Sequence, residues 1–136
     1  MRRFAPLLPG LAGLCLLGAA APAVPRALAG VAPGLWEVSR SASGQAPERL
    51  CLREVVHLAS ISQRGVRCGR TILADRPGSL LVDVTCPGGD FARSQITVTT
   101  PRSLKLQTQG IRRGEPFDLT LYARRVGSCR PIWGAR

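Results

Sequence analysis

The sequence predicts a mainly β protein, in which about six to eight antiparallel strands form a meander that curls into a half-barrel-like sheet with one short helix. Three observations predict this fold. Apolar and polar residues alternate in steps of two over most of residues 80–126, short turn-forming clusters separate the alternating runs, and four cysteines follow an apolar leader. Such alternation is typical of strands with one buried face, and turns this short leave room only for antiparallel neighbours.

The first 29 residues follow the plan of a secretory signal peptide. A basic start, Met1-Arg2-Arg3-Phe4, precedes an apolar run over residues 7–23 and the small-residue triplet Ala27-Leu28-Ala29. We expect cleavage after Ala29, with Ala21-Pro22-Ala23 as a weaker alternative site. A membrane anchor is the competing interpretation, which the four prolines of the leader disfavour because proline disrupts a spanning helix of about 20 residues.

The leader sets the expected compartment and the domain boundaries. Residues 1–29 are the predicted signal peptide, residues 30–130 a single β-rich domain, and residues 131–136 a loose C-terminal tail. Cys15 lies in the leader and is expected to be removed with it. We therefore expect a secreted, periplasmic protein that has no transmembrane span once the leader is cleaved.

The first half of the domain predicts a hairpin, a helix and a strand. Residues 35–41 and 48–52 are expected to pair around Ser43-Gly44. Residues 53–63 are the predicted helix, and residues 66–74 the next strand. The helix prediction depends on apolar residues at α-helical spacing, namely Leu52, Val55, Val56 and Ala59, with Gly65 as a stop.

Four alternating runs complete the predicted meander, over residues 79–86, 91–100, 103–110 and 117–126. Turn-forming clusters precede or separate them. The side chains expected to face the core are Leu80, Val82, Val84 and Cys86, then Ala92, Ser94, Ile96 and Val98, then Leu104, Leu106 and Thr108, and finally Phe117, Leu119, Leu121 and Ala123.

Four cysteines remain after the leader, at Cys51, Cys68, Cys86 and Cys129, and predict two disulfides in a small exported domain. Three pairings are possible from the sequence alone. We favour Cys51 with Cys68, which would bracket the short helix, and Cys86 with Cys129, which would join a strand end to the last strand. The cysteine spacing and the single histidine, His57, disfavour zinc, and no two cysteines are close enough in sequence for a redox pair. We expect no cofactor and no metal.

Trp36 is the predicted structural anchor of the core. It shares one side of the first strand with Val38, opposite Leu35 and Glu37. A tryptophan ring can bury about 200 Å². In a chain with few aromatic residues, one such ring can fill much of a small core.

Several stretches resemble a known family. They are PGLWEVS at 33–39, RLCL at 49–52 and ARRVGSC at 123–129, with further cysteines at 68 and 86. Their order and spacing are similar to the small exported bacterial proteins grouped as domain of unknown function 3617, over about residues 33–129. The resemblance implies an envelope location and a four-cysteine framework, and it implies no catalytic residue. Arg53-Glu54 stand where many members have a helix start of the Thr-Pro-Glu kind.

The predicted mature domain is strongly basic, because 16 of the 19 basic residues lie outside the leader against 8 acidic ones. Anionic envelope lipid or lipopolysaccharide is one partner that suits this charge, with Arg112, Arg113, Arg124 and Arg125 as the expected contacts. The other interpretation is the composition of a GC-rich genome, which fits the single lysine, Lys105. Nucleic acid is not an expected partner, since an exported chain meets little of it and no interleaved aromatic and basic pattern occurs.

We expect a non-catalytic envelope protein that binds an anionic surface or an apolar, lipid-like small molecule in the concavity of its sheet. The inward-facing residues are small and aliphatic, which favours a filled core over a roomy pocket. The alternatives are a structural or protein-interaction module and a small enzyme. An enzyme could use acidic residues among Asp83, Asp90, Glu115 and Asp118, whereas His57 has no partner that the sequence places beside it.

Overall fold

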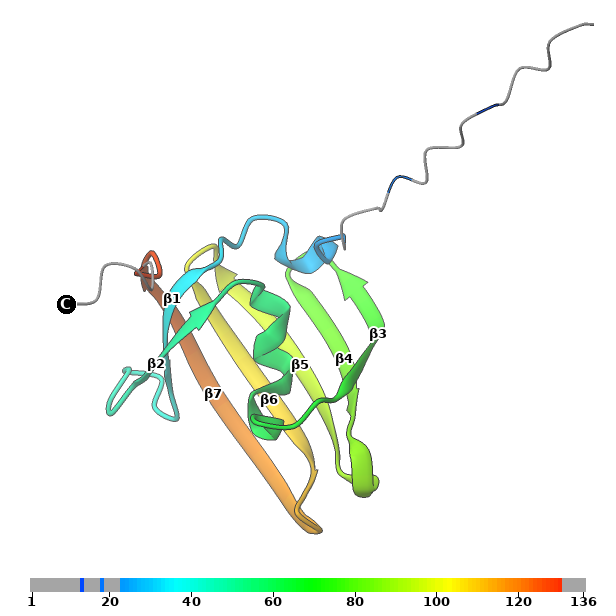
Figure 1. Ribbon diagram of the computed structural model, residues 1–136. Coiled ribbons are helices and arrows are strands. Elements are labelled where there is room, and N and C mark those ends of the chain that lie inside the picture. The colour runs from blue at the N-terminus through cyan, green and yellow to red at the C-terminus, as the bar shows by residue number, and fades with distance from the viewer. Residues whose placement is uncertain (1–12, 14–17, 19–22, 131–136) are drawn as a thin grey trace, which may run out of the picture.

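The computed structural model describes residues 13, 18 and 23–130. Within them, seven antiparallel strands form one open sheet in the order β2-β1-β7-β6-β5-β4-β3 (Figure 1). The strands are β1 (Gly34–Ser39), β2 (Glu48–Leu52), β3 (Gly69–Arg76), β4 (Ser79–Thr85), β5 (Phe91–Thr100), β6 (Ser103–Arg112) and β7 (Glu115–Gly127). The 3-10 helices are η1 (Arg26–Leu28), η2 (Val55–Gln63) and η3 (Pro87–Gly89). The predicted mainly β, antiparallel fold is confirmed.

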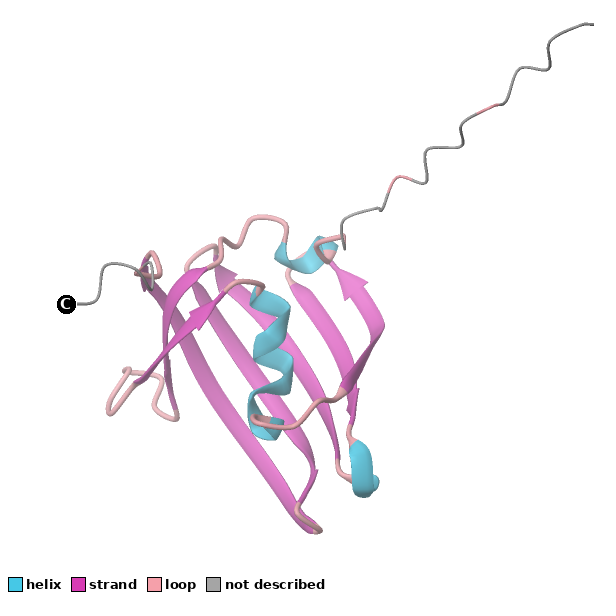
Figure 2. Ribbon diagram, viewed as in Figure 1, coloured by secondary structure: helices cyan, strands magenta, loops and turns pink. Residues whose placement is uncertain are grey.

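Strands β3 to β7 form the predicted meander, because each pairs with the next strand in the sequence. The β1–β2 hairpin lies beyond β7, so β2 and β3 are the two edges of the sheet. After β2 the chain crosses the concave face through η2 and reaches β3 at the opposite edge (Figure 2). The sheet therefore curls round η2, which forms a second layer.

The core lies between the concave face of the sheet and η2. Along β4, β5 and β6, buried positions alternate with exposed ones as the sequence predicts. Trp36 and Val38 of β1 are 0% and 6% exposed on the same face. Strand β3 is largely exposed because it forms an edge of the sheet.

The predicted helix over residues 53–63 is present as the 3-10 helix η2. A 3-10 helix has three residues per turn, so Val55, Leu58 and Ile61 form one row along it. All three are buried. The expected α-helical spacing was therefore wrong, whereas the helix lies within the predicted segment and begins at Val55 instead of residue 53. The β-branched residues and serines of this segment have low α-helical propensity, and a repeat of three places its three largest buried side chains against the sheet.

Residues 25–31 also pack on the sheet, although most of them fall in the predicted leader. The backbone N–H groups of Arg26 and Ala27, at the start of η1, donate to the two carboxylate oxygens of Asp75 on β3, at 2.8 Å each. Ala27, Leu28 and Val31 belong to the core cluster. This segment covers the end of the concave face formed by β3 and β4 (Figure 1).

The two predicted disulfides are present, but the favoured pairing was wrong. The structure joins Cys51 to Cys129 and Cys68 to Cys86, with Cα–Cα distances of 5.5 and 4.3 Å. Cys86 does not reach Cys129, because β5 and β6 separate β4 from β7. Cys51 does not reach Cys68, because η2 carries the chain from the β2 edge to the β3 edge.

The strand register explains the observed disulfides. Gly69 pairs with Thr85, so Cys68 and Cys86 face each other directly beyond the β3–β4 ladder. Leu35 of β1 pairs with Cys51 on one side and with Gly127 on the other, and the chain beyond the end of β7 brings Cys129 to Cys51, with a Cα–Cα distance of 5.5 Å. Two disulfides fit an extracellular or otherwise oxidising compartment.

Candidate functional site

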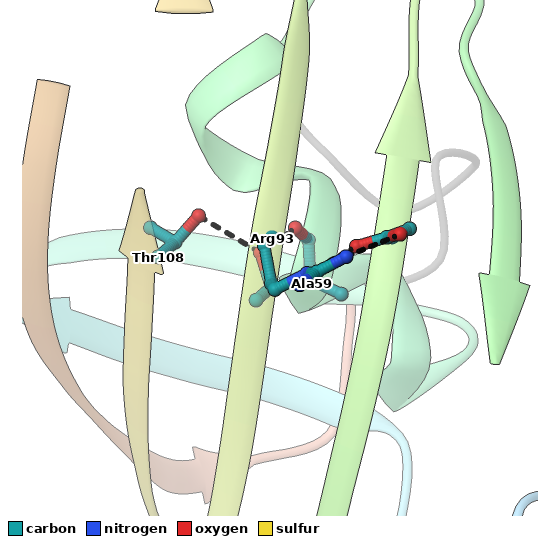
Figure 3. Close-up of polar contacts among 5 residues, drawn as sticks. Ala59, Arg93 and Thr108 are labelled. Atoms are coloured by element: carbon teal, nitrogen blue, oxygen red, sulfur yellow. Dashed lines mark hydrogen bonds and ion pairs between the residues drawn. The ribbon is translucent and has the colours of Figure 1, made fainter. Parts of the chain in front are cut away.

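Helix η2 fills the middle of the concave face and is fixed there by buried hydroxyl groups. Ser94 on β5 donates its hydroxyl to the carbonyl oxygen of Ala59 at 2.6 Å. The hydroxyl oxygens of Ser94 and Thr108 lie 2.8 Å apart (Figure 3). Both side chains are almost fully buried. The centre of the concavity is therefore filled by protein, as the aliphatic inward-facing residues predict.

Gln63, the last residue of η2, attaches the end of the helix to the sheet. Its side-chain amide nitrogen donates to the carbonyl oxygens of Phe91 at 3.2 Å and Ile111 at 2.8 Å. Phe91 and Ile111 are opposite each other on β5 and β6. Gln63 is 2% exposed, so these bonds are shielded from water. One buried amide thus holds the end of the helix to two strands.

A cavity lies beside this end of η2, where β7 extends past β1. Strand β1 pairs with residues 122–127 of β7, so within the described chain residues 115–121 have no strand on that side. The cavity has a volume of about 480 Å³. This volume falls within the range of about 300–1,000 Å³ that is usual for small-molecule sites.

The cavity has an apolar part and a polar part. Val38, Ile61, Leu119 and Leu121 contribute aliphatic side chains from β1, η2 and β7. Arg40, Arg64 and Arg112 contribute guanidinium groups from the β1–β2 loop, the residue after η2 and the end of β6. The arrangement suits a molecule with an apolar chain and a negatively charged head group.

The charge of one of these arginines, Arg64, is neutralised by an acidic side chain of the same chain. Arg64 donates through both terminal nitrogens to Glu48 of β2, at 2.5 and 2.8 Å. Hydrogen bonding between them lowers the pKa of the Glu48 carboxyl and raises the pKa of Arg64. Arg40 and Arg112, by contrast, form no ion pair with a described residue. The cavity therefore has two positive charges free to meet a ligand.

Ser62 adds a buried hydroxyl to the cavity lining. It is 5% exposed, and its oxygen has no hydrogen-bond partner among the described residues. Leaving a buried polar group unpaired costs about 1–3 kcal/mol. The hydroxyl oxygen is itself buried, so a ligand in the cavity would reach it only if the neighbouring side chains moved.

The four arginines predicted as surface contacts do not lie in one patch. Arg112 and Arg113 lie at the β6–β7 turn, whereas Arg124 and Arg125 lie near the far end of β7. A strand of ten residues spans about 30 Å. Arg124 pairs with Glu37 at 3.2 Å, and Arg125 donates to the carbonyl oxygen of Pro33 at 2.9 Å. Of the four, Arg112 lines the cavity.

The acidic residues considered for catalysis do not form one cluster, although Asp90 and Glu115 both lie at the β6–β7 turn. Arg93 donates to both carboxylate oxygens of Asp83 at 2.7 and 2.9 Å, on the convex face of β4 and β5 (Figure 3). These bonds lower the pKa of Asp83. Asp90 accepts the backbone N–H groups of Arg113 and Gly114 at the β6–β7 turn.

The remaining catalytic candidates are exposed. Glu115 and Asp118 lie on β7. His57 lies on η2, with its Nε2 atom 3.9 Å from the carboxylate of Glu54. Among the described residues, no group of three or more His, Cys, Asp or Glu side chains is arranged to hold a metal ion. In the same part of the chain, no helix combines the length and apolar character needed to cross a membrane.

Comparison with known proteins gives no match. No family model matches the sequence, and no curated protein or solved structure matches it either. The resemblance to domain of unknown function 3617 therefore stays a prediction.

Sequence analysis missed Arg40, Ser62 and Arg64 as site residues. A ligand was expected in the concavity of the sheet without a more exact place, and η2 occupies the middle of that concavity. Ser62 and Arg64 flank the end of the predicted helix, and Arg40 follows the first strand. Residues at the ends of strands and helices often lie in binding sites, and this was the signal that the sequence contained. That these residues lie together follows from the extension of β7 past β1, which the sequence did not show.

Proposed function

We propose that this protein is a non-catalytic periplasmic binding protein, exported by its leader, that holds an amphipathic carboxylate such as a medium-chain fatty acid. The observation that carries the proposal is the cavity where β7 extends past β1, with free guanidinium groups beside an aliphatic wall. The family resemblance supports the envelope location, and the disulfides fit an oxidising compartment.

The chemistry of the lining matches the two parts of such a ligand. A guanidinium group offers paired N–H donors that fit a carboxylate, and Arg112 and Arg40 form no ion pair with an acidic residue in the described part of the chain. Leu119 is half-buried and Leu121 is buried, so both can contact an alkyl chain. Burying that chain is favourable by about 25 cal/mol per Å² of apolar surface.

Binding fits the lining better than catalysis does. The single carboxylate of the cavity, that of Glu48, is occupied by both terminal nitrogens of Arg64. These hydrogen bonds lower the pKa of the Glu48 carboxyl, which makes it a weaker general base. The arginines and serines of the lining donate hydrogen bonds and hold charge, which orients a ligand without transforming it.

Isothermal titration calorimetry with decanoate tests the proposal. We expect decanoate to bind, decanol to bind more weakly, and decyltrimethylammonium not to bind, because the last has the wrong charge for the arginines. Arg112→Gln should lower decanoate affinity about tenfold or more, since hydrogen bonds to charged groups contribute about 1.5–3 kcal/mol.

The matched control is Arg113→Gln. Arg113 neighbours Arg112 at the same turn but does not line the cavity, so its substitution should leave decanoate affinity nearly unchanged. Equal losses in the two variants would show that general surface charge attracts the ligand, and the cavity proposal would be wrong. No heat of binding for decanoate under any condition would also overturn it.

A further inference from the structure

The N-terminal segment over residues 25–31 behaves as part of the folded domain. Leu28 is 1% exposed, Ala27 5% and Val31 7%, values like those of the strand residues that form the core. Leu28 and Val31 line a small cavity together with Val55 and Val56 at the start of η2. Helix η1 packs against β3 and β4.

Directed hydrogen bonds fix this segment in addition to its apolar contacts. The two oxygens of Asp75 accept one N–H group each, from Arg26 and Ala27, at 2.8 Å. Asp75 lies opposite the fully buried Leu80, on the core side of the edge strand β3. A carboxylate in that position needs partners, and the first N–H groups of η1 supply them.

Cleavage after Ala29 would leave a product with an incomplete core. It would remove Ala27 and Leu28 and both N–H donors of Asp75. Burial of a leucine side chain is lost in such a product, and a carboxylate on the core side loses its hydrogen bonds. A leader is cleaved during export, before the domain folds. The packing of residues 25–31 therefore determines which cleavage product can fold completely.

We infer that processing occurs instead at the peptide bond between Ala23 and Val24, so that residues 24–31 remain in the mature protein. The sequence has alanine at the first and third positions before this bond, Ala23 and Ala21, as signal peptidases require. Ala23 is exposed and Val24 is 70% exposed, so the peptide bond between them lies outside the core. Water hydrolyses the bond, its oxygen joining the carbonyl carbon of Ala23 while the nitrogen of Val24 becomes the new amino terminus.

Intact mass and N-terminal sequencing of the exported protein test this inference directly. The full chain is produced in a Gram-negative host and recovered from the periplasm. We expect the first residue to be Val24. A product that begins at Gly30, shorter by the six residues 24–29, would overturn the inference, as would an unprocessed chain that begins at Met1.

A matched pair of variants of the full chain locates the cleaved bond. Ala23→Leu places a large residue directly before the inferred bond, so the precursor should accumulate. Ala29→Leu makes the same change at the other candidate site, where Ala29 is exposed, so processing should proceed as in the unaltered protein. The reverse result would place the cut after Ala29.

A second measurement tests whether the segment stabilises the processed protein. Asp75→Asn replaces one of the two acceptor oxygens with a donor, so the thermal midpoint of unfolding should fall. Asp118→Asn makes the same change at an exposed position of β7 and should leave the midpoint unchanged. Equal midpoints would show that the segment does not pack on Asp75. None of these experiments involves a ligand, so their outcomes do not depend on the proposed binding function.

Discussion

Two ends of the concave face are built differently. At the end formed by β3 and β4, residues 25–31 cover the sheet with apolar side chains and bind Asp75 through backbone N–H groups. At the end formed by the first half of β7, Leu119 and Leu121 border a cavity together with arginine side chains. One sheet thus has a covered end and an open end.

With the proposed binding function, the covered end stabilises the fold and the open end binds the ligand. Apolar burial is the main stabilising term, so the covered end contributes to folding. The open end leaves Arg112 free and Ser62 unpaired among the described residues, which lowers stability. Natural proteins often accept such local losses at binding sites. The following changes would test this division.

Removal of the disulfides should have the largest effect. Cys51–Cys129 holds the β1–β2 hairpin to the β7 side, and Cys68–Cys86 holds β3 to β4, with sequence separations of 78 and 18 residues. In the loop-entropy model, these disulfides contribute about 4.5 and about 3 kcal/mol to the free energy of unfolding. Urea denaturation of Cys51→Ser/Cys129→Ser and Cys68→Ser/Cys86→Ser should show that order. A larger loss for the second variant would mean that local strand pairing, and not loop length, sets the contribution.

Truncation of one leucine at each end compares the ends directly. Leu28→Ala in the covered end should lower the free energy of unfolding by about 2–5 kcal/mol, because Leu28 is 1% exposed. Leu119→Ala in the open end should cost about 1 kcal/mol or less, because Leu119 is half-buried and water already reaches it. Urea denaturation measures both. Equal costs would mean that the two ends are equally packed, contrary to the comparison.

Much of the covered part of the fold could be predicted from local sequence. The alternation along β4, β5 and β6 identified the buried residues correctly, because a strand has a fixed repeat of two. The hairpin of β1 and β2 was also predicted, since its turn lies within a few residues of both strands. Strand β3 covers Gly69–Arg76, so it begins three residues later and ends two residues later than the predicted 66–74.

Features that depend on distant segments could not be predicted in the same way. The cysteine pairing depends on the strand order, in which the β1–β2 hairpin joins β7 at the far edge. The cavity exists because β7 extends past β1. The local pattern of apolar and polar residues does not indicate how far one strand extends past another. The nearly symmetric positions of Cys68 and Cys86 about the turn at Pro77-Gly78 were a usable signal for one disulfide, because residues equidistant from a hairpin turn face each other. The one-residue difference corresponds to the bulge between Ile72 and Ala74.

Loss of a buried hydroxyl in the middle of the face should have an intermediate effect. Ser94→Ala removes the donor to the Ala59 carbonyl and the contact with Thr108. The free energy of unfolding should fall by about 1–3 kcal/mol, the cost of leaving a buried acceptor unpaired. Ser128→Ala, at an exposed position after β7, is the control and should have little effect on urea denaturation. No change in Ser94→Ala would show that apolar packing alone holds η2 between the two ends.

The smallest expected effect concerns the ion pair at the open end. The pKa of Glu48 is lowered in the folded protein, so its pair with Arg64 contributes stability above the ordinary carboxyl pKa of 4.5, and this contribution is lost as the pH falls through the lowered value. Both side chains are about half exposed, so Glu48→Gln should cost less than about 1 kcal/mol at neutral pH. Urea denaturation should show this difference at neutral pH, and the difference should decrease as the pH is lowered below 4.5. Glu48→Gln also frees Arg64, so decanoate should bind this variant more tightly, whereas weaker binding would mean that the pair is needed to shape the cavity.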